Sequence, residues 1–359
     1  MEIRDQECDG GQMIALAKNP LFACVTEDTD EWFTKAYNLV LSIRRMGGSL
    51  SSAPVIVHFV GSVQPAFRTS LEELGAEVRV VEPYGSRYRF SNKMRMFDLF
   101  EEDHYDVLVA IDCDVIVTGD ISNQLERNAI GIVPAGRDHL TPDQWRDIYE
   151  LFEVDAPEPS CMMRVTGQRT YPYFNTGVMS IPRELGPRML KTWTDFLEKM
   201  ERVHERWPNV LHENQIAFAL AVAAEGMPLR ELPVGLNLST VVPPAREFNR
   251  ELRAPFVIHY HKAIDEDGFV LASRSRRADR AINSFNKIRA GELGLGYRRL
   301  ERLPLLKRVQ RTAATRSWYN GRALKRLRKS AAGTAIRKVG RRSRSEHESR
   351  HKEPRRTSV

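Results

Sequence analysis

The sequence predicts an α/β fold in which a mostly parallel β-sheet is flanked by helices and followed by a basic tail. Short apolar runs alternate with helical patterns along most of the chain, as expected of parallel strands joined by right-handed crossovers. One further apolar run, residues 105–117, is interrupted by Asp112 and Asp114 but otherwise has the composition of a strand covered on both faces. Such sheets bind ligands at the carboxyl ends of their strands, so we expect the binding site at that edge of the sheet.

Strands are expected where runs rich in Val, Ile and Phe are bounded by polar residues or glycine. These runs are residues 21–26, 54–60, 77–81, 107–114, 129–135, 178–182 and 254–262. Periodic apolar spacing predicts helices at residues 31–46, 65–74, 92–101, 143–152, 188–206 and 216–224. Asp30 and Ser91 are the expected N-caps of the first and third helices.

Charge divides the chain of 359 residues into two parts, although its net charge is only +7. From Tyr297 onward there are 21 Lys or Arg against 4 Asp or Glu, a charge of +17. The preceding part has 33 against 43, a charge of −10. We therefore expect one acidic domain over residues 1–296 and a separate basic tail over residues 297–359.

The acid pair indicates a metal site. In an extended segment, residues two apart point to the same side, so Asp112 and Asp114 would converge and repel. Mg²⁺ or Mn²⁺ removes that penalty and usually binds together with substrate phosphates. The chemistry indicated is metal-assisted handling of a diphosphate. The alternative is a turn in which the acids only accept backbone N–H bonds.

Other polar residues share the expected rim. Thr26 ends the first strand, although an ordinary strand end explains it equally well. Lys93 and Arg95 lie in the first turns of a predicted helix, where the helix dipole disfavours cations, so an anion is expected nearby. The alternative is a solvated helix face.

Three later segments add candidates. His259 and His261 share one side of a predicted strand, so one of them could reach the metal, although a lone histidine there is more often structural. Asn214 and Gln215 precede a buried helix at the open end of the sheet, where they are either helix caps or sugar contacts. In Asn175-Thr176-Gly177, the glycine allows close approach of a ligand or simply a turn.

Taken in order, these features resemble the GT-A glycosyltransferases that use nucleotide-sugar donors, particularly the family that includes glycogenin and bacterial lipopolysaccharide galactosyltransferases. The resemblance covers about residues 20–270. It rests on Val25-Thr26, Lys93 with Arg95, Asp112-Cys113-Asp114, Phe174-Asn175-Thr176-Gly177-Val178-Met179 and Ile258-His259-Tyr260.

The resemblance implies a GT-A (Rossmann-like) fold and a hexosyltransferase that takes a nucleotide-sugar donor, with a UDP-sugar favoured. It implies that Mn²⁺ or Mg²⁺ is bound by Asp112, Asp114 and His259. It places Thr26 and Glu27 at the nucleotide base, and Asn175 and Gln215 beside the transferred sugar. Residues 137–170 are then a candidate acceptor-facing insertion.

The chain departs from the family pattern at two points. The family usually follows its metal-binding histidine with Gly and then Lys-Pro, whereas here only Lys262 is available for the diphosphate. The family's Asp-Gln pair appears as Asn214-Gln215, which removes one carboxylate from the reaction side.

The expected mechanism follows from the charge on the departing nucleoside diphosphate. The metal, with Lys262, Lys93 or Arg95, would stabilise that charge while an acceptor hydroxyl attacks the anomeric carbon. An inverting enzyme would need a carboxylate base, for which Asp138 and Glu213 are candidates. Retention is favoured because the resembled family retains configuration and Gln215 matches its residue beneath the sugar.

The tail suggests a membrane surface. Leu300, Leu303, Leu306 and Val309 recur among arginines at helical spacing, a pattern suited to anionic lipids and to a glycolipid acceptor, and sequence beyond Gly340 reads as disordered. The alternative is a solvated tail. The four cysteines have no paired spacing, and neither a secretory leader nor an 18-residue apolar stretch is evident, which favours a cytoplasmic protein, peripheral at the inner face of the membrane.

Two other functions are compatible with parts of the pattern. A nucleotidyltransferase or sugar-phosphate enzyme could use paired acids, but the sequence has neither a Gly-rich phosphate loop nor further acid pairs for two metals. Nucleic-acid binding through the tail is the non-enzymatic alternative. The acidic body makes nucleic acid an unlikely main partner.

Overall fold

A computed structural model describes residues 15–85, 89–102, 104–203, 206–207, 212–253, 256–273 and 275–295. All of these except Arg206 and Trp207 belong to one compact unit, whose fold is given below. In the other unit, the guanidinium of Arg206 lies 5.3 Å from the centroid of the Trp207 ring. The predicted membrane-binding tail, residues 297–359, lies outside the described residues.

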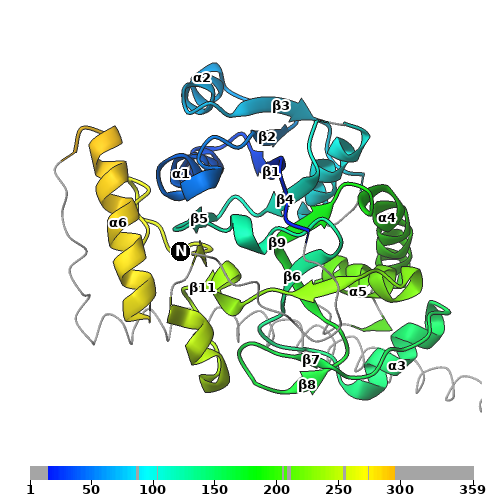
Figure 1. Ribbon diagram of the computed structural model, residues 1–359. Helices are drawn as coiled ribbons and strands as arrows, with labels where there is room; N and C mark the ends of the chain where they lie inside the picture. Colours follow the sequence, from blue (N-terminus) through cyan, green and yellow to red (C-terminus); the bar gives the residue numbers. More distant parts are fainter. Residues whose placement is uncertain are drawn as a thin grey trace, which may run out of the picture. The chain divides into compact units, whose positions relative to one another are not determined.

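A seven-stranded sheet in the order β10-β6-β9-β4-β1-β2-β3 forms the centre of the unit (Figure 1). Its strands are β1 (Pro20–Glu27), β2 (Val55–Val60), β3 (Glu77–Val81), β4 (Val107–Ile111), β6 (Ile130–Pro134), β9 (Phe174–Pro182) and β10 (Leu229–Glu231). Every pairing is parallel except those of β9, which runs antiparallel to both β4 and β6. The prediction of a mostly parallel sheet is confirmed.

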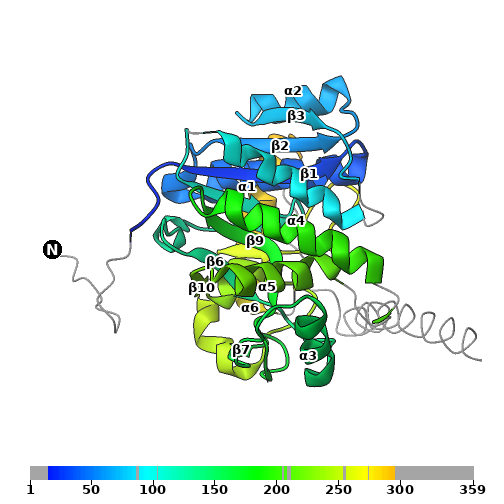
Figure 2. The same ribbon diagram turned by 90° about the vertical axis from the view of Figure 1, so that its right-hand side faces the viewer.

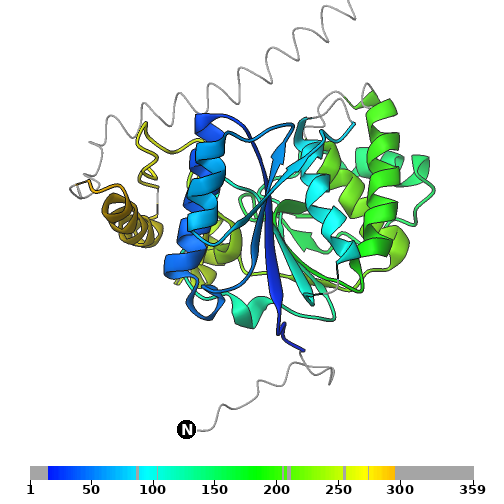
Figure 3. The same ribbon diagram turned by 90° about the horizontal axis from the view of Figure 1, so that it is seen from above.

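Helices cover both faces of this sheet. The α-helices are α1 (Asp30–Met46), α2 (Pro65–Glu73), α3 (Pro142–Leu151), α4 (Gly186–Val203), α5 (Glu213–Glu225) and α6 (Arg276–Glu292). The 3₁₀ segments are η1 (Gly48–Leu50), η2 (Arg89–Glu101), η3 (Ser122–Gln124), η5 (Val234–Asn237) and η6 (Arg246–Arg253). Seen from above, α1 and α2 lie on one side of the sheet, and η2, α4 and α5 on the other (Figure 3). Figure 2 shows α4 and α5 in front of the sheet.

A second, three-stranded sheet, β11-β12-β5, lies beside the first. Its strands are β5 (Val115–Val117), β11 (Leu238–Ser239) and β12 (Val257–His259), and α6 packs with it around a core that includes Ile116, Ile258 and Ile282. The chain therefore leaves the central sheet after β4 and enters the second sheet at β5. The acid pair lies in the turn directly after the end of β4, so the predicted strand over residues 107–114 ends at Ile111 and the chain then enters the second sheet.

Several local predictions are corrected. Thr29, not Asp30, is the N-cap of α1: its backbone is extended and its side chain accepts a hydrogen bond from Trp32 N–H, while Asp30 already lies in the first turn. Residues 89–101 form a 3₁₀ segment that includes Ser91 instead of an α-helix capped by it. Helix α6, capped by Ser275, was not predicted. Within the insertion at residues 137–170, the helix predicted at residues 143–152 is present as α3, whereas a hairpin of β7 (Cys161–Met162) and β8 (Arg169–Thr170) was not predicted.

Among the described residues, no helix combines the length and the apolar character needed to cross a membrane.

Candidate active site

The candidate site lies where the end of β4, the beginning of β9 and the end of β12 meet. Asp112 N–H donates to the carbonyl of Gly177 at 2.8 Å, which joins the turn after β4 to β9. Tyr260 N–H donates to the carbonyl of Asp114 at 3.1 Å, which joins the same turn to the residue after β12. The two acids are thus anchored to different sheets.

Asp114 and His259 form a direct pair. Asp114 Oδ1 lies 2.9 Å from His259 Nε2, and the histidine side chain is only 6% exposed. Burial would raise the pKa of Asp114, but the ring of His259 holds it well below its usual value. Burial would lower the pKa of His259, but the carboxylate of Asp114 raises it above its usual value. Each partner therefore favours the charged form of the other.

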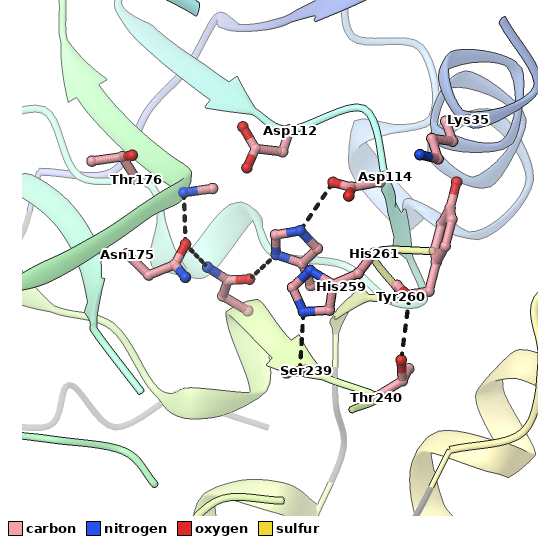
Figure 4. A network of polar contacts seen from close by, with 12 residues as sticks. Lys35, Asp112, Asp114, Asn175, Thr176, Ser239, Thr240, His259, Tyr260 and His261 are labelled. Atoms are coloured by element: carbon pink, nitrogen blue, oxygen red, sulfur yellow. Dashed lines mark hydrogen bonds and ion pairs between the residues drawn. The ribbon is translucent and has the colours of Figure 1, made fainter. Parts of the chain in front are cut away.

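His261 lies against this pair. Its ring stacks on that of His259, with centroids 3.9 Å apart, and its Nε2 lies 3.1 Å from Ser239 Oγ (Figure 4). Burial, followed by the nearby His259, lowers the pKa of His261 to about 3, so its ring is neutral at neutral pH. Its φ of 58° is in the left-handed region, which is strained for a residue with a side chain.

Asp112 lies on the other side of the site. Its Oδ1 accepts a hydrogen bond from Lys93 Nζ at 3.0 Å, and the same ammonium donates to Thr176 O at 3.1 Å and Thr176 Oγ1 at 3.2 Å. A Cβ added at Gly177 would lie 2.9 Å from Asp112 Oδ2 and 3.1 Å from His259 Cε1. Asp112 and His259 therefore border the same small space, which exists because residue 177 has no side chain.

The residues around this space fit a divalent cation. Asp114, His259 and His261 each offer one ligand atom, and these atoms lie within 4.8 Å of one another. Carboxylate and imidazole together suit Mn²⁺ and similar ions, while Mg²⁺ prefers oxygen ligands. Asp112 adds a further carboxylate across Gly177, although its nearest described partner is Lys93.

A chain of side-chain amides continues from His259. His259 Nδ1 lies 3.0 Å from Asn237 Oδ1, and Asn237 Nδ2 donates to Asn175 Oδ1 at 2.9 Å. Asn175 Oδ1 also accepts the backbone N–H of Gly177 at 2.8 Å. Figure 4 shows this chain running from β9 to the histidine. Asn175, predicted beside the sugar, is thus in the same network as the predicted metal ligand.

The residues predicted to bind the nucleotide and the diphosphate are placed differently from one another. Thr26 is buried, and its hydroxyl donates to the carbonyl of Trp32 at 2.9 Å, while Glu27 ends β1. Arg95 turns away from the acids and donates to the carbonyls of Glu82 at 2.9 Å and Pro83 at 3.3 Å. Lys262 is exposed next to His261. Lys93, by contrast, contacts an acid of the pair, Asp112.

The residues predicted to contact the sugar or to act as a base also lie in different parts of the fold. Asp138 accepts hydrogen bonds from Leu140 N–H at 2.9 Å, from Trp145 Nε1 at 2.7 Å and from the Thr170 hydroxyl. All three donors lie within the insertion, so Asp138 links different parts of the insertion to one another. Asn214 is buried, and its Nδ2 donates to Thr176 Oγ1 at 3.2 Å, beside Lys93. Gln215 and Glu213 are half-buried in the first turn of α5.

The sequence matches the Rhodobacterales glycosyltransferase domain over residues 23–226, more than half of the chain. The chain belongs to this glycosyltransferase family. The prediction of a glycosyltransferase is thereby confirmed. No curated protein sequence matches the chain.

Several solved glycosyltransferase structures are similar to this glycosyltransferase at low identity. The galactosyltransferase LgtC, in complex with donor and acceptor sugar analogs, has 14% identity and a TM-score of 0.46, over 80% of this chain and 99% of that one. GlyE of Streptococcus pneumoniae has 16% identity and a TM-score of 0.44, over 77% and 63%. Mouse xyloside xylosyltransferase 1 has 13% identity and a TM-score of 0.43, over 68% and 98%.

Two residues of the glycosyltransferase site were missed by the sequence analysis. Lys35 of α1 is only 1% exposed, its Nζ lies 2.8 Å from Glu31 Oε1, and its charge helps to lower the pKa of Asp114. Asn237 is buried between Leu236 and Leu238. Each could have been noticed as a polar residue in an otherwise buried segment. Lys35 lies at helical spacing from two other buried polar residues, Asn38 and Ser42.

Proposed function

We propose that this glycosyltransferase is metal-dependent and moves a hexosyl group from a nucleotide-sugar donor, with UDP-sugars favoured, to an acceptor hydroxyl on a glycan or glycolipid. The observation that carries this proposal is the Asp114–His259 pair, which faces Asp112 across the space at Gly177. A carboxylate–imidazole pair with a second carboxylate on the far side of the histidine suits a cation that is shared with a diphosphate.

The chain's own residues would have distinct roles. Asp114 and His259 would hold Mn²⁺ or Mg²⁺, with Asp112 on the diphosphate side. The bound cation would supply positive charge that stabilises the departing diphosphate. Lys93 places a second positive charge next to Asp112 and is the best-supported cation for the same task. Lys262 is a further candidate, and Arg95 is less favoured because its guanidinium is bound to residues 82–83.

We propose that transfer retains the anomeric configuration, with Asn175 and Gln215 beside the sugar. Inversion would need a carboxylate base on the acceptor side. Asp138 is poorly suited to that role because it already accepts three hydrogen bonds within the insertion. The anomeric signal of the product in an NMR assay tests this point, and an inverted product would remove the retaining assignment.

The decisive experiment is a screen for hydrolysis of UDP-, GDP- and ADP-sugars with Mn²⁺. We expect one donor class to be cleaved, and Asp114→Ala to abolish that signal together with Mn²⁺ binding. Asp143→Ala removes a carboxylate that is 80% exposed on α3 and serves as the matched control. Equal turnover by Asp114→Ala and the wild type would refute the proposal.

The basic tail supports the further proposal that the acceptor is membrane-associated and that the protein is peripheral at the inner face of the membrane. This part rests on the sequence alone, in which apolar residues recur among cations at helical spacing.

A further inference from the structure

Asn237 is a buried amide at the junction of the two sheets. It is the last residue of η5, directly before β11, and it is only 9% exposed between two leucines. A buried amide without hydrogen-bond partners would cost stability. Both polar atoms of Asn237 are paired, one with His259 and the other with Asn175.

The backbone fixes which way these amides point. A side-chain amide can exchange its oxygen and nitrogen by a half-turn, but the backbone N–H of Gly177 can only donate. The Asn175 atom that faces it, 2.8 Å away, must therefore be the oxygen. The Asn237 atom that faces this oxygen, 2.9 Å away, must be the nitrogen. It follows that Asn237 turns its oxygen towards His259.

This order of hydrogen bonds determines which nitrogen of the His259 ring carries a hydrogen. Asn237 Oδ1 lies 3.0 Å from His259 Nδ1, so Nδ1 must carry a hydrogen and donate it. The other ring nitrogen, Nε2, is then the atom turned to Asp114, 2.9 Å away. A histidine that binds a metal through one nitrogen ordinarily donates the hydrogen of the other to a fixed acceptor.

We propose that Asn237 is a positioning residue for the cation site: it keeps the hydrogen on Nδ1 of His259 and presents Nε2 to Asp114 and the cation. The inference rests on the proposed metal-dependent function. The hydrogen-bond order begins at a backbone N–H on β9, so the orientation of the histidine is set by the sheet itself and not by the cation.

Two substitutions separate this role from simple packing. Asn237→Leu keeps the number of heavy atoms and the branching at Cγ but offers no acceptor, whereas Asn237→Asp keeps an acceptor for His259 and loses the hydrogen bond to Asn175. We expect Asn237→Leu to weaken Mn²⁺ binding about 10- to 100-fold, measured by the EPR signal of free Mn²⁺. We expect Asn237→Asp to bind Mn²⁺ within a few-fold of the wild type. If Asn237 only fills space, Asn237→Leu should bind Mn²⁺ more tightly than Asn237→Asp. That result would overturn the proposal.

A second measurement reads the ring without any donor sugar. In the full-length protein with ¹⁵N-labelled histidine, the His259 signal is assigned by its loss in His259→Gln. We expect Nδ1 of wild-type His259 to carry a hydrogen both without metal and with Mg²⁺. In Asn237→Leu we expect the hydrogen no longer to be held on Nδ1. Asn286→Leu is the control, because Asn286 is also buried but pairs with the backbone of Val270. A wild-type His259 without hydrogen on Nδ1 would overturn the inference.

The two arms distinguish the failure of this inference from the failure of the proposed function. If the wild type binds no Mn²⁺ and cleaves no nucleotide sugar, the metal-dependent function is refuted, and with it the role of Asn237 towards a cation. If the wild type binds Mn²⁺ and Asn237→Leu binds it equally well, only the role of Asn237 is refuted.

Discussion

Gly177 is the residue at which the packing requirements of the site are clearest. Its N–H is bound to Asn175 and its carbonyl to Asp112, so both backbone groups are committed. It is not among the glycines with positive φ, so its backbone conformation is open to other residues. What the position requires is room, because the space beside its Cα is bordered by Asp112 and His259.

We therefore predict that Gly177→Ala will disable the site with little effect on folding. The new methyl group would lie 2.8 Å from Asn175 Oδ1 and 2.9 Å from Asp112 Oδ2, so these side chains must move. We expect transfer to fall on the order of 100-fold, as displacements of about 1 Å in active sites can cause. Initial rates and Mn²⁺ titration measure the effect.

Gly291→Ala in α6 is the matched control. Nothing lies within 4 Å of a Cβ added at Gly291, so this alanine should leave activity unchanged and raise the free energy of unfolding by about 0.5–1 kcal/mol. Equal rates for Gly177→Ala and the wild type would contradict the account of the space at Gly177.

At the residue scale, the sequence identified groups whose spacing was unusual. Asp112, Asp114 and His259 interrupt apolar runs, and the structure brings Asp114 and His259 together. It did not assign roles to Asn237 or Lys35, although each is a polar residue in a buried segment, because those roles depend on which distant residues lie beside them. Lys93 and Arg95 looked equivalent, and only the fold shows that one bonds to Asp112 and the other to the loop before η2.

Strand β2, which lies between β1 and the edge strand β3, carries a buried histidine. His58 is 2% exposed, and its Nδ1 lies 3.3 Å from the carbonyl of Cys24 on β1. Burial lowers the pKa of His58 below its usual value in spite of that hydrogen bond. The unfolded chain, with an ordinary histidine pKa of about 6.5, binds this proton more readily than the folded chain.

We predict that His58 makes the protein less stable in acid. The contribution of a neutral His58 is fully present above about pH 6.5 and is lost as the pH falls towards the lowered pKa of the folded state. Chemical unfolding between pH 8 and pH 5 should show a smaller loss of stability in His58→Gln than in the wild type. Parallel pH profiles for the two proteins would contradict the prediction.

A buried arginine is one of the residues that attach helix α6 to the domain. Arg289 donates to Asn38 Oδ1 of α1 at 2.7 Å and, through Nε and Nη2, to the carbonyl of Asp267 at 3.1 and 2.9 Å. Its side chain therefore joins α6 both to α1 and to the loop after β12. The sequence pattern did not reveal this helix, because many of its residues are charged and its partners lie far away in the chain.

We predict that Arg289→Met will loosen α6. Each buried acceptor left unpaired should cost about 1–3 kcal/mol, so the midpoint of urea unfolding should fall clearly. Arg277→Met, at an exposed position of the same helix, should change the free energy of unfolding by less than about 0.5 kcal/mol. A similar midpoint for both variants would mean that Arg289 does not anchor the helix.

At the scale of the whole molecule, the alternation of strands and helices was enough to predict the parallel part of the sheet. It was not enough to reveal the second sheet, because β5, β11 and β12 have only two or three residues each. Strands this short carry no readable period, and they pair across large sequence separations. The site lies at the junction of the two sheets. The sequence therefore predicted Asp112, Asp114 and His259 as site residues but not the sheet that brings them together.

The opposite charges of body and tail lead to a prediction for the whole chain. With +17 after residue 296 and −10 before it, the full chain should sediment with anionic vesicles at low salt. A chain ending at residue 296 should remain in the supernatant, and neutral vesicles should retain neither protein. Unchanged sedimentation after truncation would contradict a membrane role for the tail.

The reversed direction of β9 has a consequence for how such enzymes diversify. The excursion between β6 and β9 departs and returns at a single rim, because the last residue of β6, Pro134, is paired with the first of β9, Phe174. Evolution can lengthen, shorten or replace that excursion while both anchoring strands keep their partners. Changes confined to residues 135–173 would leave Asp112, Asp114 and His259 on other elements of the fold, untouched by the exchange.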